Sequence, residues 1–139
     1  MTGRFRLDSL LRLRSAERDA AAAELSRVSE RVRDGEALVA RTRAALERLT
    51  PAAADVHELR AIAAARLANA NMLDELRERG ASARSELDAA SAAFTTAGVR
   101  LRTLDRLAER SAADAREQEL RQEQAALDEI AQNRRGEVA

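Results

Sequence analysis

Residues 7–49, LDSLLRLRSAERDAAAAELSRVSERVRDGEALVARTRAALERL, carry the apolar repeat from which the fold is predicted. Steps of alternately four and three residues from Leu7 give one row of positions, which we call the first seam: 7, 11, 14, 18, 21, 25, 28, 32, 35, 39, 42, 46 and 49. Its apolar members are Leu7, Leu11, Leu25, Val28, Val32, Val39, Leu46 and Leu49, with Ala21 as a small one. A 3.5-residue period over six heptads keeps one helix face toward a partner helix, so it predicts a coiled coil.

The composition favours the same structure. The chain has 139 residues, the size of one domain, with 35% charged and 1% aromatic residues. Ala, Leu, Arg and Glu dominate it, and all four are strong helix formers. A compact globule of this length uses more large apolar side chains to close its core. Disorder is the alternative, and the regular apolar spacing argues against it, so we expect a long coiled coil.

The charges exclude some classes of function. All 24 basic residues are Arg, and 24 acidic residues balance them to a net charge of zero. Nucleic-acid and membrane-surface binders usually have a strongly basic balance or face, so both classes are disfavoured. The mixed signs favour i,i+4 ion pairs along exposed helix faces.

The chain shows no sign of a membrane segment or of disulfides. It has no cysteine, no apolar run near the ~20 residues that span a bilayer, and no apolar core of a secretory signal at its start. We expect a cytoplasmic protein.

One strong helix breaker divides the chain. Pro51 cannot continue a helix, and it restricts Thr50 as well. Asp55, with Glu58 three residues later, resembles a capping box at the start of the next helix. We therefore predict a single coiled-coil domain over 1–139, all-α, with two long helices in an antiparallel hairpin. The expected bounds are helix 1 at about 5–49, a turn at 50–55 and helix 2 at about 56–135.

Helix 2 has a row of its own, the second seam. It comprises Leu59, Ile62, Arg66, Asn69, Leu73, Leu76, Gly80, Ala83, Leu87, Ala90, Phe94, Ala97, Leu101, Leu104 and Ala108. Folding the chain back at 50–55 predicts four seam pairs: Leu46 with Leu59, Val32 with Leu73, Val28 with Leu76 and Leu11 with Phe94. Such polar members as Arg66 usually fix register.

Helix 2 is expected to be longer than helix 1, so that its C-terminal part overhangs. From about residue 100 onward no partner within the chain is expected, although apolar residues continue: Leu101, Leu104, Leu107, Leu120, Leu127 and Ile130. The regular seam breaks after Ala115. We expect these residues to dock on another protein or on a second copy.

No motif for catalysis, a cofactor or a metal is present in the sequence. The five glycines are scattered singly, so there is no phosphate-binding loop. His57 is the only histidine, and one His beside Asp55 and Glu58 is too few ligands for a metal. Adjacent carboxylates are frequent by chance in so acidic a chain, and a rod has no enclosed site to shift their pKa values. We predict that the protein is not an enzyme.

Both ends of the chain resemble the FliJ family of flagellar export proteins. The opening FRLDSLLRLR (5–14), followed by Glu17, is similar to the start of that family. The closing segments LDRLAER (104–110) and ELRQEQAALDEIA (119–131) are similar to its C-terminal signature. The resemblance covers essentially the whole chain and implies an antiparallel two-helix stalk and general chaperone of flagellar type III export.

The resemblance also implies partners and contacts. The two terminal ends would enter the ring of the flagellar export ATPase, the hairpin side would face the export gate that includes FlhA, and export chaperones would be handled as well. The expected ATPase contacts are Phe5, Leu7, Leu10, Leu11, Arg14, Leu120, Leu127, Asp128 and Ile130. For Leu7 and Leu11, simple seam packing is an equal alternative. Two other readings remain open, a self-assembling coiled-coil scaffold and a related type III secretion stalk protein.

Overall fold

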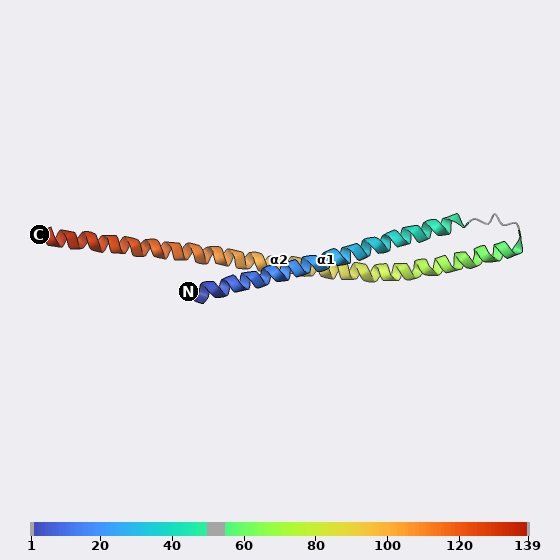
Figure 1. Cartoon of the computed structure of the whole chain (residues 1–139), viewed down its shortest axis with the longest axis horizontal. Coiled ribbons are helices and arrows are strands. Elements are labelled where there is room, and N and C mark those ends of the chain that lie inside the picture. The colour runs from blue at the N-terminus through green and yellow to red at the C-terminus, as the bar shows by residue number, and fades with distance from the viewer. Residues whose placement is uncertain (1, 50–54, 139) are drawn as a thin grey trace. The chain divides into compact units, whose positions relative to one another are not determined.

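A computed structural model describes residues 2–49 and 55–138 as two long helices (Figure 1). Helix α1 spans Thr2–Arg48 and helix α2 spans Val56–Val138, and no strand occurs in these two ranges. Compared with the expected bounds, α1 begins before residue 5 and α2 continues past residue 135. The predicted break at Pro51 and most of the predicted turn lie outside the described residues.

The start of α2 follows from its capping residue. Asp55 Oδ1 accepts a hydrogen bond from the Glu58 backbone N–H at 2.8 Å, and the Asp55 carbonyl accepts one from the Leu59 N–H at 3.2 Å. An Asp that binds the N–H three residues on satisfies one of the four free donors of a helix N-terminus. The predicted Asp55 cap is therefore confirmed.

The chain divides into two compact units, which we describe one at a time. Unit 1 comprises Met1–Ala16 and Gly98–Ala139, and unit 2 comprises Glu17–Ala97. Both helices contribute residues to each unit. The single-domain organisation expected for 1–139 stays a prediction.

In unit 2 the two helices pack antiparallel. Arg31 forms an ion pair with Glu86 at 2.8 Å, and Arg66 Nε donates to the Leu49 carbonyl at 2.9 Å. Residue numbers thus rise along α1 while those of their partners fall along α2. The predicted all-α fold with an antiparallel helical pair is confirmed.

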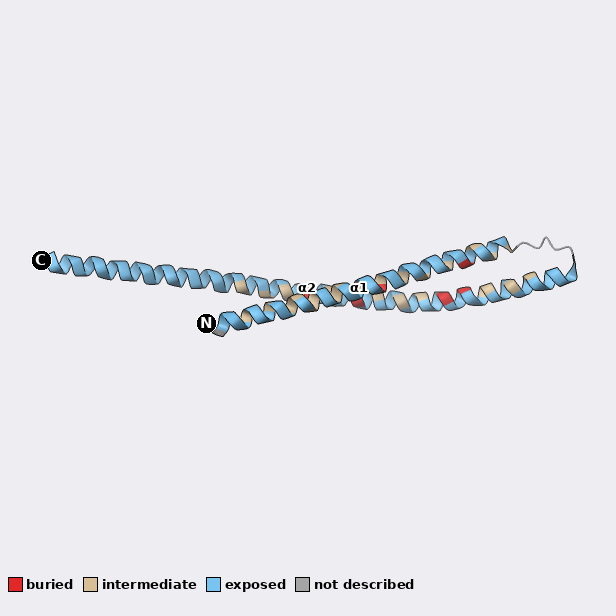
Figure 2. Cartoon of the chain, in the orientation of Figure 1, coloured by how far each residue is buried: buried red, intermediate tan, exposed pale blue. Residues whose placement is uncertain are grey.

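The core of unit 2 is the seam itself (Figure 2). Val28 is only 2% exposed, and burying a side chain of this size stabilises a fold by roughly 1.5–3 kcal/mol. The other buried residues are Thr42, Leu73, Leu76, Ala90 and Ala97. Thr42 is the polar member, and its hydroxyl donates to the Leu38 carbonyl at 2.9 Å. The buried hydroxyl is therefore satisfied within its own helix.

The predicted seams agree with the observed burial at nearly every position. All thirteen members of the first seam are buried or half-buried. The second seam agrees except at Leu59 and Arg66, which are exposed. These two exceptions lie near the start of α2 and are explained by the register.

The predicted register is wrong. It would place Val56 opposite Leu49, whereas Arg66 binds the Leu49 carbonyl, so the true pairing is displaced by about ten residues, roughly three turns. The predicted pairs Leu46–Leu59, Val32–Leu73 and Val28–Leu76 are therefore not formed. The physical reason is that α2 is capped at Asp55 and runs for more than two turns before it lies opposite the end of α1. The pairing of Leu11 with Phe94 joins different units and stays a prediction.

In unit 1 the burial changes abruptly along α2. Leu7, Leu11 and Arg14 of α1 are half-buried. The half-buried seam residues of α2 in this unit are Leu101, Leu104 and Ala108, and both sets keep the spacing of the seams. From residue 109 to residue 138 every residue is exposed (Figure 2), and we call this part the C-terminal segment. The overhang thus begins later than expected, and Leu101 and Leu104 were wrongly assigned to it.

Candidate partner-binding surfaces

The C-terminal segment carries a row of exposed apolar side chains. Leu120 is 64% exposed, Leu127 61% and Ile130 53%. Their spacing of seven and three residues places them on one helix face. Because each residue turns the helix by about 100°, Leu120 and Leu127 lie roughly 100–120° around the axis from the seam residue Ala108, and Ile130 lies roughly 40° from it. The exposed row therefore lies to one side of the line that the seam would follow.

Local side-chain contacts support the helix in this segment. Arg121 forms an ion pair with Glu117, and the Gln124 amide donates to Asp128 Oδ1 at 3.4 Å. Each such i,i+4 pair contributes only a few tenths of a kcal/mol at an exposed site. The segment has eight acidic residues and five Arg, a net charge of −3. Glu117 and Glu123 lie three residues from Leu120, while Arg116 and Arg134 lie four residues from Leu120 and Ile130, so both signs flank the apolar row.

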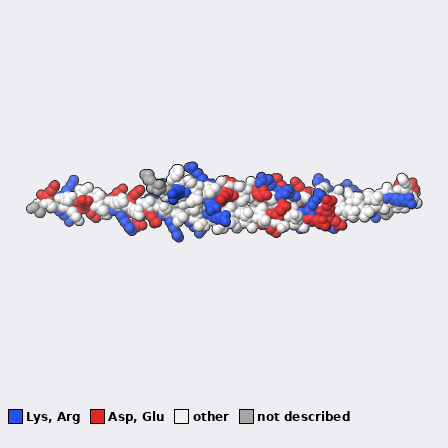
Figure 3. All heavy atoms as spheres, turned by 90° about the horizontal axis from the view of Figure 1, so that it is seen from below, with Lys and Arg blue, Asp and Glu red and all other residues white. Residues whose placement is uncertain are grey.

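The N-terminal turns of α1 form a second candidate surface. Phe5 is 76% exposed and Leu10 is also exposed, because neither lies on the first seam. Between residues 2 and 14 four Arg accompany one Asp, a net charge of +3. This surface therefore differs in sign from the C-terminal segment. Elsewhere the two signs are mixed, and Figure 3 shows basic and acidic side chains interspersed on the face that it presents.

The structure does not gather the nine predicted contact residues into one site. Leu7, Leu11 and Arg14 lie on the seam, half-buried within unit 1. Leu120, Leu127, Asp128 and Ile130 belong to the C-terminal segment, where every described residue is exposed. The predicted set therefore makes two separate surfaces. Their role as ATPase contacts stays a prediction.

One further exposed residue was missed by the sequence reasoning. Leu13 belongs to unit 1 and is at least as exposed as Leu10, as is Leu107, which was expected to dock on a partner. Leu13 lies off the seam, and this was the signal available in the sequence. An apolar residue off the seam of a two-helix coiled coil has no partner within it.

Among the described residues no group of three or more His, Cys, Asp or Glu side chains is placed to hold a metal ion. His57 is exposed near the start of α2. No helix in the described ranges has a stretch long and apolar enough to cross a bilayer.

Two antiparallel helices with a common seam and further exposed apolar side chains define a coiled-coil protein. Comparison with known families agrees: the family described as "Flagellar FliJ protein" matches residues 3–136. The chain belongs to the FliJ family. Members of this family are structural and chaperone-type proteins with a role related to flagellar export. No curated protein and no solved structure matches the chain.

Proposed function

We propose that this protein is a coiled-coil stalk and general chaperone of flagellar type III export that binds the export ATPase ring and links it to the export gate. The observation that carries the proposal is the exposed row Leu120, Leu127 and Ile130 on a helix segment covered by no other described residue. Single exposed leucines are common, but three on one face match the anchors of a helix that binds in a groove. Family membership supplies the context of flagellar export.

The proposed partners follow from the two surfaces and the family. The C-terminal segment and the exposed Phe5 and Leu10 bind the ATPase ring. The hairpin side meets the gate protein FlhA, and unloaded export chaperones are bound along the stalk. The protein would then work in the cytoplasm, peripheral to the inner face of the cell membrane, which it reaches only through the gate.

Leu127→Glu tests the ATPase contact. A carboxylate in the middle of the apolar row must be desolvated on docking, so we expect binding to the organism's flagellar export ATPase to fall at least about tenfold in biolayer interferometry. Ala125→Glu is the matched control, because it adds the same charge to an exposed position on the opposite helix face. Circular dichroism should show unchanged helicity in both variants. An equal loss of ATPase binding in both variants, or no loss in Leu127→Glu, would contradict the proposal.

Size-exclusion chromatography with light scattering separates the stalk from the scaffold. We expect a monomer of 15.2 kDa that co-elutes with the ATPase when the two are mixed. In a self-assembling scaffold the same apolar row would pair between copies. A stable dimer that does not bind the ATPase would therefore contradict the stalk proposal and favour a self-assembling scaffold.

A further inference from the structure

Two glycines, one from each helix, lie in the same layer of the seam in unit 2. Gly35 of α1 and Gly80 of α2 line the same groove, whose volume is about 780 Å³. An added Cβ at either glycine has nothing within 4 Å, apart from its own helix backbone and chain neighbours. The helices therefore do not approach each other closely at this layer. The seam has a gap here where other layers have side chains.

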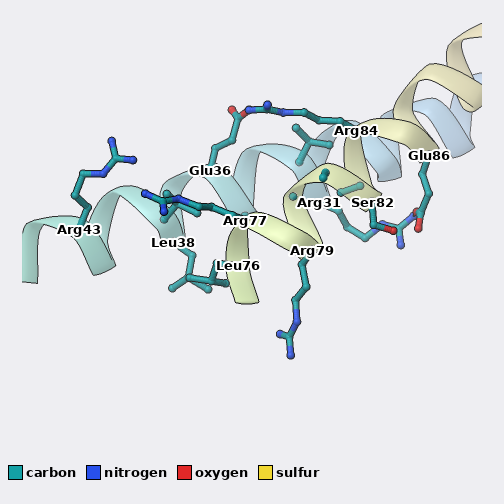
Figure 4. A pocket seen from close by; sticks show the side chains of 16 residues that line it. Arg31, Glu36, Leu38, Arg43, Leu76, Arg77, Arg79, Ser82, Arg84 and Glu86 are labelled. Atoms are coloured by element: carbon teal, nitrogen blue, oxygen red, sulfur yellow. The ribbon is translucent and has the colours of Figure 1, made fainter. Parts of the chain in front are cut away.

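Leu38 and Leu76 lie among the side chains that line the gap, and charged side chains surround them (Figure 4). Val39 and Leu76 line it from the neighbouring seam layers, and Leu38 lines it from α1. Two ion pairs cross between the helices beside it, Arg31 with Glu86 at 2.8 Å and Arg84 with Glu36 at 3.1 Å. These cross-links favour a constant separation of the helices at the glycine layer. A space of this size is in the range of whole small-molecule sites, so it has room for one large side chain and for part of the segment that carries it.

The rim of the gap is basic. Five Arg and two Glu line it, a net charge of +3, and four of the five Arg are in ion pairs with carboxylates on or beside the rim. Arg79 pairs with Glu75 of its own helix at 2.6 Å, and Arg77 lies 3.6 Å from Asp74. Arg43 has no ion pair with any of the described residues. A carboxylate of a partner would bind Arg43 first, because guanidinium groups bind carboxylates in bidentate geometry and the other rim Arg residues are already paired.

We propose that the Gly35–Gly80 gap is a docking site for a protein segment that carries one bulky apolar side chain between acidic residues. The apolar side chain fills the space that the two glycines leave, and its acidic neighbours pair with the rim Arg residues. The charge of the rim favours this occupant over a basic or neutral segment. The site lies in unit 2 and shares no residue with the ATPase-binding surfaces, so the two proposals stand or fall separately.

Titration of the full-length ¹⁵N-labelled chain tests the proposal. The probe is a short synthetic peptide with one Trp between Glu residues. We expect the amide signals of Gly35 and Gly80 to shift, while those of Gly98 and Gly136 do not move. Peptides with Ala in place of Trp, or Lys in place of Glu, should bind at least about tenfold more weakly.

Gly80→Leu fills the gap, and we expect it to weaken peptide binding at least about tenfold. Ala93→Leu is its control, because it adds the same side chain at an exposed position of α2 outside the gap. If Gly80→Leu loses helicity, Arg43→Glu replaces it as the test. Its control is Arg33→Glu, an exposed α1 position that does not line the gap.

Several outcomes would overturn the proposal. Absence of shifts at both glycines at millimolar peptide excludes the site. If Gly80→Leu binds the peptide as tightly as the intact chain does, the peptide binds elsewhere. The same conclusion follows if the Lys peptide binds as tightly as the Glu peptide. If the intact chain is a dimer in light scattering and Gly80→Leu is a monomer, the occupant is a second copy and the proposal is wrong.

Discussion

At the scale of single residues, the polar side chains at the hairpin end of unit 2 act on helix termini. Asp55 binds a free N–H at the start of α2, and Arg66 binds the Leu49 carbonyl just beyond the end of α1. The last carbonyls of a helix lack partners within it, so a guanidinium from a neighbouring helix is a favourable cap. The Arg that occupies the second seam at position 66 therefore has a structural function that apolar packing does not supply.

Asp55→Ala removes the N-cap of α2. We expect the free energy of unfolding to fall by about 1 kcal/mol, because a Glu58 backbone N–H loses its acceptor. Urea denaturation followed by circular dichroism measures the change. Asp55→Asn, which keeps a side-chain oxygen, should stay close to the parent stability. A loss in Asp55→Asn as large as that in Asp55→Ala would show that the charge, and not the cap, is responsible.

Gly98→Ala should stabilise the protein. Gly98 lies inside α2 with a negative φ, and an added Cβ meets nothing within 4 Å apart from its own helix backbone and chain neighbours. Alanine at such a position gains roughly 0.5–1 kcal/mol over glycine in helix propensity. The same change at Gly136, close to the helix end at Val138, should gain less because the last turn frays. Thermal unfolding gives both values, and a loss at Gly98 would contradict the open space at this position.

At the scale of elements, the support of α2 differs between its parts. In unit 2 it packs against α1 through a seam with buried members such as Val28 and Leu73. In unit 1 the half-buried positions end at Ala108. The C-terminal segment retains only its own backbone hydrogen bonds and exposed i,i+4 pairs. Most helical stability in proteins comes from tertiary packing, so this segment is the least stable part of α2.

Hydrogen exchange measured by mass spectrometry should reveal this difference. We expect amides of 109–135 to exchange much faster than those of 20–48 and 66–95, because local opening there breaks no seam contact. Residues 101–108 should be protected together with the seam. Protection that is uniform along α2 would contradict this distribution of stability. Addition of the export ATPase should then slow exchange in 109–135 and in the turns around Phe5 and Leu10, and leave 20–95 unchanged.

At the scale of the whole molecule, the sequence repeat predicted which residues face the seam but not how the two helices are aligned. A 3.5-residue repeat is local, so the sequence was enough to identify which residues face the seam, including Thr42 and the half-buried Arg14. Register depends instead on where the second helix first meets the first. The hydrogen bond from Arg66 to the Leu49 carbonyl marks that point, and a contact between residues so far apart in sequence cannot be predicted from a periodic pattern.

The candidate surfaces were predictable to a similar degree. Leu120, Leu127 and Ile130 were identified because helix 2 was expected to be longer than helix 1 and to overhang it, and all three are exposed. Leu13 was missed because the reasoning followed a family resemblance instead of the off-seam position. The gap at Gly35 and Gly80 could not be foreseen, because the wrong register placed the two glycines apart.

The cap that Arg66 forms on the Leu49 carbonyl has a consequence for how the chain can be divided. Both partners in that contact lie outside 50–54, as do the ion pairs Arg31–Glu86 and Glu36–Arg84. Two separate peptides, cut within 50–54, therefore carry every described contact that pairs α1 with α2 in unit 2. Their association becomes bimolecular and depends on concentration, since the covalent link contributes only the entropy of loop closure. We therefore expect the two peptides to reassociate through the same contacts when their concentration is high enough.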